Sequence, residues 1–144
     1  MLHVCRFIAV ACAALFAGAS LYINVAEHPA RLKLSTQAAV AQWAPSYHRA
    51  TFMQAPLAIT SCLAGIAAWL LGDGVVWLVA AVLIGAVVPF TLIAILPTNR
   101  ALLSPDRDPG SASTRSLLLR WGRLHAIRTV LSLAATALDI AFLA

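Results

Sequence analysis

The chain has 144 residues, of which 62% are hydrophobic and only 10% are charged. An average soluble domain has about a quarter charged residues, so this composition excludes an ordinary cytosolic domain, a disordered chain and a disulfide-stapled secreted module. The formal net charge of +5 would suggest nucleic-acid binding in a soluble protein. Here most basic residues lie beside apolar segments, so we expect a lipid bilayer around most of the chain and no nucleic-acid partner.

Four segments have the length and composition of membrane-spanning helices, which need about 20 apolar residues each. In chain order they cover about residues 5–26, 50–71, 75–96 and 118–142 of a single membrane domain. No charged residue interrupts positions 7–26, 50–72 or 74–99. The fourth segment contains charged residues, which must then face protein or water; these are Arg120, Arg123, Arg128 and Asp139. The sequence therefore predicts an all-α integral membrane protein, an antiparallel four-helix bundle.

The first segment also has the features of a signal peptide, namely an early Arg6, an apolar stretch and small residues at positions 17–19. If it is a span, the turn Gly72–Gly74 makes the second and third spans a hairpin, and residues 27–49 and 97–117 form loops on one side. Nine of the ten Lys and Arg residues gather toward that side, against Arg6 alone on the other. By the positive-inside rule we expect a multi-pass cell-membrane protein with these loops in the cytoplasm and both termini outside.

The chemically reactive side chains gather at the same end of the predicted bundle. They are Asn24, Glu27 and His28 at the end of the first span, Tyr47, His48 and Gln54 at the start of the second, Asn99 at the end of the third, and Trp121, His125 and Arg128 in the fourth. Because a buried polar group costs free energy unless it has a partner, this one-sided convergence indicates a site.

Several of these residues also have a structural interpretation. Tyr47 and Trp121 suit interfacial anchors, and Glu27 could be the ion-pair partner of Arg31 or Arg128. Arg128 lies two turns inside a span, where a charged side chain marks a functional site by default. A structural role therefore explains Arg128 least well.

Four runs of residues resemble the anthrone oxygenase-like family of small four-helix membrane proteins. They follow the family's order over nearly the whole chain: GASLYINVAEHPARL at 18–32, WAPSY at 43–47, PFT to PTN at 89–99, and WGRLHAIR at 121–128. The resemblance implies oxygenation of an anthrone, a flat hydrophobic aromatic polyketide, to an anthraquinone by O2.

Such a reaction needs a base that removes a proton from an activated CH2 group, and a group that stabilises the enolate. We expect His125, or Glu27 with His28, to be the base and Arg128 to stabilise the enolate oxygen. Because an electron-rich carbanion can reduce O2 directly, a base and a group that stabilises the oxyanion could suffice, and the sequence commits to no cofactor. The residues expected to bind the substrate are Asn24, Tyr47, Gln54 and Asn99, by hydrogen bonds, and Trp121, by stacking.

Two alternatives follow from the same residues. In the first, His28, His48 and His125 bind copper or iron, and the protein is a metal-dependent membrane redox enzyme. In the second, the polar cluster only holds the helices of a non-enzymatic scaffold or lipid-binding protein together, which predicts no cavity at this end. Nothing in the sequence specifies an oligomeric state.

Overall fold

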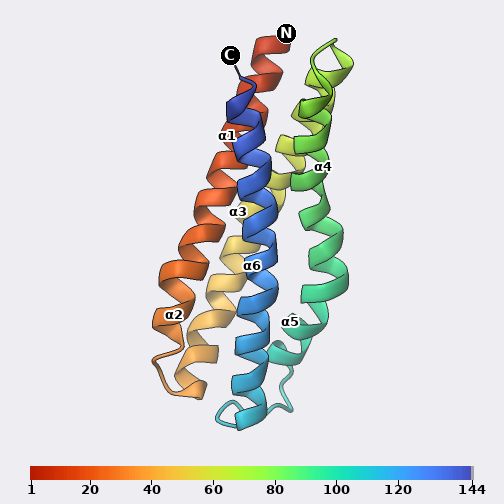
Figure 1. Cartoon of the computed structure of the whole chain (residues 1–144). Coiled ribbons are helices and arrows are strands. Elements are labelled where there is room, and N and C mark those ends of the chain that lie inside the picture. Colours follow the sequence, from red (N-terminus) through yellow and green to blue (C-terminus); the bar gives the residue numbers. More distant parts are fainter. Residues whose placement is uncertain (144) are drawn as a thin grey trace.

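The computed structural model describes residues 1–143, which form a bundle of four helical rods (Figure 1). The first rod comprises α1 (Leu2–Tyr22), a π-helical turn η1 (Ile23–Glu27) and α2 (His28–Arg31); the second is α3 (Thr36–Leu70); the third comprises α4 (Val75–Phe90), a π-helical turn η2 (Thr91–Ile95) and α5 (Leu96–Leu103); the fourth is α6 (Ala112–Ala141). Each of the four rods is long and apolar enough to cross a membrane. The predicted all-α four-helix architecture is confirmed.

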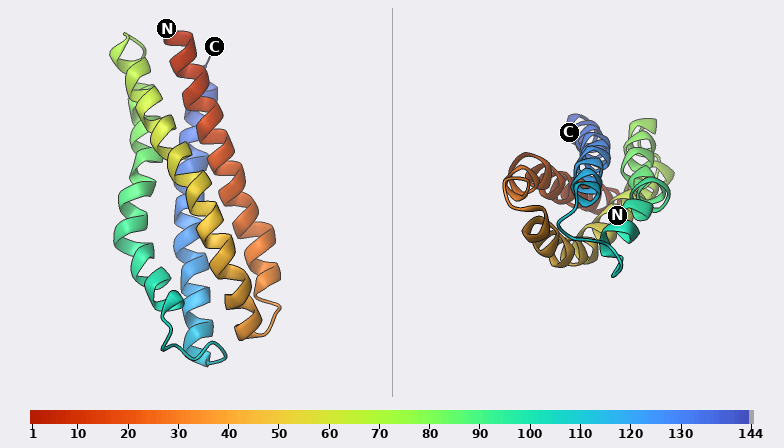
Figure 2. Two further views of the ribbon diagram at one scale, coloured as in Figure 1. Left: turned by 180° about the vertical axis from the view of Figure 1, so that it is seen from behind. Right: turned by 90° about the horizontal axis from the view of Figure 1, so that it is seen from below.

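The rods run alternately up and down and close into a ring. The α1 helix packs on α3 and α6, and α4 packs on the same two helices from the other side (Figure 2). Both termini lie at one end together with the α3–α4 turn, and we call this the terminal end (Figure 1). The α2–α3 and α5–α6 connections lie at the opposite end, which we call the connecting end. The bundle is thus antiparallel.

The two connections at the connecting end are much shorter than the loops predicted at 27–49 and 97–117. Helices fill most of those ranges and leave only residues 32–35 and 104–111 between them. The Ser35 hydroxyl caps α3 by accepting a hydrogen bond from the Ala38 N–H, and Ser111 caps α6 through the Thr114 N–H. The polar composition was misleading because many of these side chains pair with one another instead of meeting solvent.

Each π-helical turn ends two residues before a proline. Pro29 follows η1 and Pro97 follows η2. A proline has no N–H for the carbonyl four residues earlier, and its ring crowds that carbonyl. π-Helical turns are often found at functional sites. Both turns contribute side chains to the cavity described below, among them Ile23 and Ile95.

Small residues bring the helices close together in the terminal half of the bundle. A Cβ atom added at Gly65 of α3 would lie 3.0 Å from the Ala81 Cβ of α4, and one added at Gly85 would lie 2.8 Å from the Cys62 Sγ. In lipid, where burial from water does not drive helices together, such close packing holds them. The terminal half is therefore solidly packed, and α3 and α4 touch there almost backbone to backbone.

An ion pair between Arg6 and Asp73 ties α1 to the α3–α4 turn at the terminal end. The hydrogen bond from Arg6 lowers the pKa of Asp73. A carboxyl group whose pKa is lowered by folding stabilises the fold above its unfolded pKa of about 4, and the contribution disappears as pH falls through the folded pKa.

The Asp73→Asn variant should therefore unfold at a lower temperature than the unmodified protein at pH 7, and this difference should shrink as pH falls below about 4. Thermal unfolding in detergent at several pH values measures it. Asp106→Asn, in the exposed connection between α5 and α6, is the matched control and should show no such difference. A difference that stayed constant down to the lowest pH would contradict the assignment.

Candidate active site

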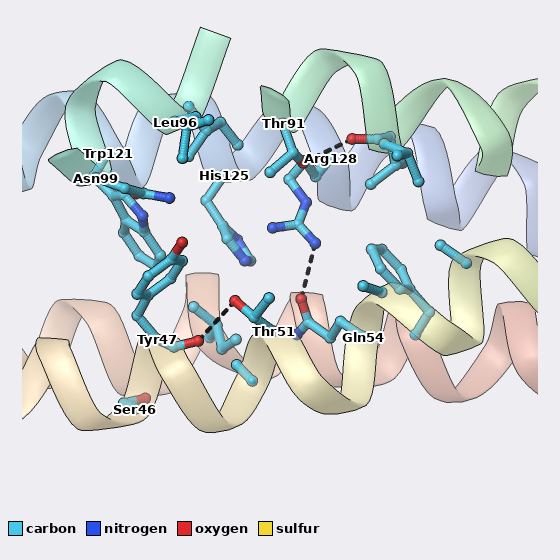
Figure 3. A pocket seen from close by; sticks show the side chains of 18 of the residues that line it. Ser46, Tyr47, Thr51, Gln54, Thr91, Leu96, Asn99, Trp121, His125 and Arg128 are labelled. Atoms are coloured by element: carbon cyan, nitrogen blue, oxygen red, sulfur yellow. Dashed lines mark hydrogen bonds between the residues drawn. The ribbon is translucent and has the colours of Figure 1, made fainter. Parts of the chain in front are cut away.

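A cavity of about 180 Å³ lies in the connecting half of the bundle, and all four rods contribute to its wall. Most of the wall is apolar, as in typical small-molecule sites. Figure 3 shows how polar and aromatic side chains project into it from α3, from the third rod and from α6. Those that line it are Arg31, Trp43, Ser46, Tyr47, Thr51, Gln54, Thr91, Asn99, Trp121, His125 and Arg128.

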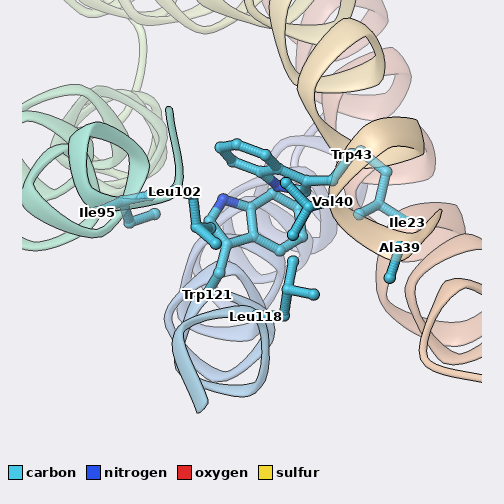
Figure 4. Packing of buried hydrophobic residues seen from close by; sticks show 8 residues of the cluster. All are labelled: Ile23, Ala39, Val40, Trp43, Ile95, Leu102, Leu118 and Trp121. Carbon is cyan, nitrogen blue, oxygen red and sulfur yellow. The ribbon is translucent and has the colours of Figure 1, made fainter. Parts of the chain in front are cut away.

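Two tryptophans close the cavity toward the connecting end. Trp43 of α3 and Trp121 of α6 meet edge to face, with ring centroids 5.9 Å apart, and Leu102 and Leu118 pack against them in one apolar cluster (Figure 4). Tyr47 stacks on Trp43 with a centroid distance of 5.1 Å and an angle of 6° between the rings. The aromatic faces of this cluster form one end of the cavity.

His125 is buried and projects into the cavity from α6, and Asn24 determines which of its ring nitrogens carries the hydrogen. His125 Nδ1 lies 2.7 Å from Asn24 Oδ1, and the Thr129 hydroxyl donates to the same oxygen at 2.6 Å. Asn24 Nδ2 donates to the Gly122 carbonyl at 3.2 Å, which identifies the other end of the amide as the acceptor. Because an amide oxygen only accepts, His125 Nδ1 carries the hydrogen and Nε2 has the free lone pair of the neutral ring.

Arg128 of α6 is a partly buried cation that has no counter-ion among residues 1–143. Its Nη2 donates to Gln54 Oε1 at 2.9 Å, and its guanidinium carbon lies 5.3 Å from the centroid of the Phe16 ring. Within residues 1–143, no Asp or Glu forms an ion pair with Arg128, and its Nε is buried without a hydrogen-bond partner. Since a guanidinium stays charged in proteins and an uncompensated charge inside a protein is costly, an anionic group of a ligand in the cavity would stabilise Arg128.

Other polar atoms of the cavity residues also lack a hydrogen-bond partner within the described chain. Among the described residues, Trp43 Nε1, Gln54 Nε2 and Asn99 Oδ1 are buried and make no hydrogen bond. Proteins satisfy nearly all of their buried polar atoms. Several unsatisfied atoms in the residues of one cavity therefore indicate that a ligand or ordered water completes the site.

Glu27 belongs to a separate network and does not line the cavity. Arg31 Nη2 donates to Glu27 Oε1 at 2.6 Å, and Gln42 and Ser46 donate to the same oxygen at 3.1 and 2.6 Å. Arg31 also donates to the Gln42 side chain. Of the two partners that the sequence suggested for Glu27, the structure thus selects Arg31. This network joins the first rod to α3 and keeps Arg31 at the edge of the cavity.

His28 lies behind Trp121 and outside the cavity wall. Its ring centroid is 5.1 Å from that of Trp121, and its Nδ1 lies 3.3 Å from Arg31 Nη1. Trp121 in turn stacks on His125 with a centroid distance of 4.9 Å. The His28 ring occupies the space that Gly122 leaves free, since a Cβ atom added there would lie 2.6 Å from His28 Cδ2. The glycine is therefore needed for His28 to support Trp121.

Gly122→Ala should destabilise the protein by about 1–3 kcal/mol, because the added methyl group overlaps the His28 ring in a packed region. Thermal unfolding in detergent measures the change. Gly18→Ala, where an added Cβ meets nothing within 4 Å, is the matched control and should not destabilise. The double variant Gly122→Ala/His28→Ala should recover most of the loss, and equal stability of the two glycine variants would contradict the packing argument.

The structure separates the sequence-predicted residues into three groups. Tyr47, Gln54, Asn99, Trp121, His125 and Arg128 line the cavity; Asn24, Glu27 and His28 lie behind it; His48 is exposed and outside its wall. Asn24, expected to bind the substrate, is instead hydrogen-bonded to His125. In the part of the chain that the structure describes, no three His, Cys, Asp or Glu side chains could hold a metal ion together. The three histidines considered as copper or iron ligands are therefore not brought together.

Some cavity residues were not selected from the sequence. Arg31 resembled an ordinary positive-inside charge, Trp43 was noted only as part of the run WAPSY at 43–47, and Thr51 carried no signal. The spacing of Trp43 with Tyr47 is i, i+4, which places the pair on one helical face and could have indicated Trp43. The alternative of a non-enzymatic scaffold predicted no cavity at this end of the bundle, and the structure contradicts that expectation.

Known proteins similar to this chain share one description. The family described as anthrone oxygenase matches residues 43–138. The anthrone oxygenase tpcL of Aspergillus fumigatus is 31% identical over 142 residues, covering 92% of this chain and 88% of that protein. An anthrone oxygenase of Claviceps purpurea is 28% identical over 141 residues (88% and 81%), and the anthrone oxygenase ptaC of Pestalotiopsis fici is 30% identical over 115 residues (69% and 80%). No solved structure matches the chain.

Proposed function

The chain belongs to the anthrone oxygenase family, and from this membership and the geometry of the cavity we propose that it oxidises an anthrone with O2 to the corresponding anthraquinone. One observation carries the proposal. A single apolar cavity contains both His125, whose Nδ1 is occupied by Asn24, and Arg128, which has no counter-ion among the described residues. These are the base and the anion-stabilising group that the reaction needs.

The two groups match the two reacting ends of an anthrone. Its CH2 group and its ketone oxygen lie at opposite ends of the central ring. His125 and Arg128 are neighbours on one face of α6, about one helical turn apart, so the base can reach the CH2 group while the guanidinium meets the oxygen. His125 Nε2 removes the proton, and Arg128 stabilises the negative charge that develops on the oxygen.

The aromatic side chains suit the shape of such a substrate. Trp43, Tyr47 and Trp121 line the cavity, and offset or edge-to-face contacts between aromatic rings add to the free energy of burial. The buried Asn99 Oδ1 has no hydrogen-bond partner within the described chain and can accept from a substrate hydroxyl. A flat hydroxylated aromatic molecule satisfies both features.

The oxidation that follows balances without another oxidant. The enolate transfers one electron to O2, and the resulting radical and superoxide combine to form a peroxide at the former CH2 carbon. Protonation gives a hydroperoxide. Its O–O bond breaks, the terminal OH leaves with the second hydrogen of that carbon as one molecule of water, and a carbonyl group remains. One oxygen atom of O2 enters the quinone and the other becomes water. The cavity lies in the membrane-spanning part of an apolar bundle, which O2 enters readily.

The proposal is tested with purified protein in detergent or nanodiscs and an anthrone as substrate. The expected result is consumption of one O2 per anthrone above the spontaneous rate, with one atom of ¹⁸O from ¹⁸O2 in the quinone. Turnover should survive treatment with a metal chelator. No rate above the spontaneous oxidation would refute the proposal, and loss of turnover that copper or iron restores would favour the metal-dependent route.

We further propose that the connecting end faces the cytoplasm. Nine of the ten Lys and Arg residues lie toward this end, which supports the orientation by the positive-inside rule. A C-terminal alkaline phosphatase fusion, active only outside the cytoplasm, should then be active, whereas a fusion in the connection at residues 104–111 should not.

A further inference from the structure

We propose that the cavity opens sideways into the bilayer, through a mouth between α3 and the third rod, and that its ligand enters from lipid and not from water. The identity of the ligand rests on the proposed function, whereas the mouth itself rests on the exposure and packing of the residues around the cavity. The phase that supplies the substrate is then the lipid, and the ligand is a flat apolar molecule with an ionisable oxygen.

The wall of the cavity is exposed on one side of the bundle and mostly buried on the others. The wall residues contributed by α1, η1 and α6 are mostly buried: Phe16, Ile23, Trp121 and His125 are each 8% exposed or less. The exposed wall residues are Thr51 and Ala55 of α3 and Leu92 of η2. The opening therefore lies between α3 and the third rod.

The course of α3 explains this opening. Close to the terminal end α3 and α4 run side by side, held by the close approach of Gly65 and Ala81. Toward the connecting end α3 crosses to the side of the first rod, while η2 and α5 continue on the other side (Figure 2). The Glu27–Arg31 network holds α3 there through Gln42 and Ser46. The two helices thus separate where the cavity begins.

Both ends of the cavity are closed by packed side chains. Toward the terminal end lies an apolar cluster that includes Phe16, Ala58 and Val87, which also line the cavity. Toward the connecting end lies the cluster around Trp43 and Trp121 (Figure 4). A packed apolar layer therefore closes each end of the cavity, and the exposed residues of its wall lie at the lateral mouth between α3 and the third rod.

The position of the mouth along the helices places it within the hydrocarbon. Arg49 and Arg100 are exposed on the two helices that border it, and such side chains extend toward the headgroups. At 1.5 Å per residue, Ala55 lies about 9 Å beyond Arg49, and Leu92 lies about 12 Å before Arg100. Both residues therefore face the acyl chains of the leaflet at the connecting end.

Narrowing the mouth should slow the enzyme. Ala55→Trp, assayed in nanodiscs with an anthrone dissolved in the lipid, is expected to lower kcat/KM at least about tenfold, chiefly by raising KM, because the indole fills the entrance of a concave site. Ala134→Trp, at an exposed position of α6 that does not line the cavity, should stay within about twofold. Unchanged kcat/KM in a folded Ala55→Trp protein would overturn the inference.

A second experiment needs no turnover. The three native cysteines are first replaced by alanine; they are Cys5, Cys12 and Cys62. Leu92→Cys is then introduced, and the protein in proteoliposomes is labelled with either a lipid-soluble pyrene maleimide or a charged, water-soluble maleimide. The lipid-soluble reagent should label Leu92→Cys and the charged one should not. An anthraquinone should slow labelling of Leu92→Cys but not of Ala134→Cys. Labelling by the charged reagent, or absence of protection, would overturn the inference.

The two experiments also separate this inference from the proposed function. If the unmodified protein oxidises no anthrone but Leu92→Cys behaves as described, the proposed function fails and the lateral mouth stands. If the unmodified protein oxidises an anthrone and Ala55→Trp does so equally well, the mouth fails and the proposed function stands.

Discussion

Arg128→Ala is expected to lower kcat/KM for an anthrone by about 100- to 1,000-fold, the usual cost of removing one group that stabilises an oxyanion, without unfolding the protein. Arg128 makes one side-chain hydrogen bond, to Gln54, and has no ion-pair partner within residues 1–143. Its loss therefore breaks little of the packing and removes a partly buried charge whose desolvation has a cost. Steady-state kinetics and thermal unfolding of the same preparation measure the two effects.

The sign of the stability change distinguishes a catalytic from a structural role. If Arg128 held the helices together, alanine would lower the unfolding temperature along with activity. If it awaits a ligand, the unfolding temperature should stay the same or rise. Arg128→Lys should recover part of the activity, because it restores the charge but not the planar two-pronged geometry. Arg123→Ala, at an exposed position of the same helix, is the matched control, and normal turnover of Arg128→Ala would refute the assignment.

His125→Phe is expected to lower kcat by about 10²- to 10⁴-fold, the range that a positioned general base contributes. Phenylalanine keeps a flat ring against Trp121, on which His125 stacks, so the cavity should keep its shape and the substrate its affinity. The effect should therefore appear in kcat more than in KM. Single-turnover kinetics with binding monitored by tryptophan fluorescence separates the two. His48→Phe, at an exposed histidine outside the cavity wall, should behave like the unmodified protein.

Asn24 provides the test of the tautomer. Asn24→Leu removes the acceptor that holds the hydrogen on His125 Nδ1 and also leaves the Thr129 hydroxyl without this partner. We expect an intermediate loss of kcat, smaller than that of His125→Phe, with KM little changed because Asn24 does not line the cavity. A rise in KM with unchanged kcat would instead restore Asn24 to the substrate-binding role that the sequence suggested.

The losses of activity in Arg128→Ala and His125→Phe should be large because the site is shielded from water. The two apolar clusters that close the ends of the cavity keep the local dielectric constant low, and charged interactions are stronger in such surroundings. Exclusion of water also protects a carbanion from reprotonation while it waits for O2. In the proposed reaction, the stacked Trp43 and Tyr47 rings would both contact the substrate and exclude water.

Much of the architecture could be predicted from composition and spacing. Long uncharged segments are incompatible with anything but lipid or a large core, and 144 residues are too few for such a core. The short Gly72–Gly74 turn then made two helices neighbours. Spacing by three and four residues placed His125 and Arg128 on one face of α6, and their position inside a span indicated the site.

Partners between helices could not be predicted, because spacing along one helix says nothing about its rotation against another. The π-helical turn at Ile23–Glu27 changes the direction of every later side chain on the first rod. It separates Asn24, which contacts His125, from Glu27, which contacts Arg31. The exposed position of His48 likewise depends on how α3 is turned about its axis.

The tertiary structure also decided which charges are compensated. Arg31 and Arg128 look alike in the sequence, since each is a cation near polar residues in the half of a span that is closer to the connecting end. In the fold, Arg31 forms an ion pair with the Glu27 carboxylate, whereas the only side-chain hydrogen bond of Arg128 among the described residues is to the neutral Gln54. Helix packing brings the Glu27 carboxylate to Arg31 and leaves Arg128 without an ion-pair partner among residues 1–143. That choice, together with the separation of α3 from the third rod, turns a membrane bundle into a candidate enzyme.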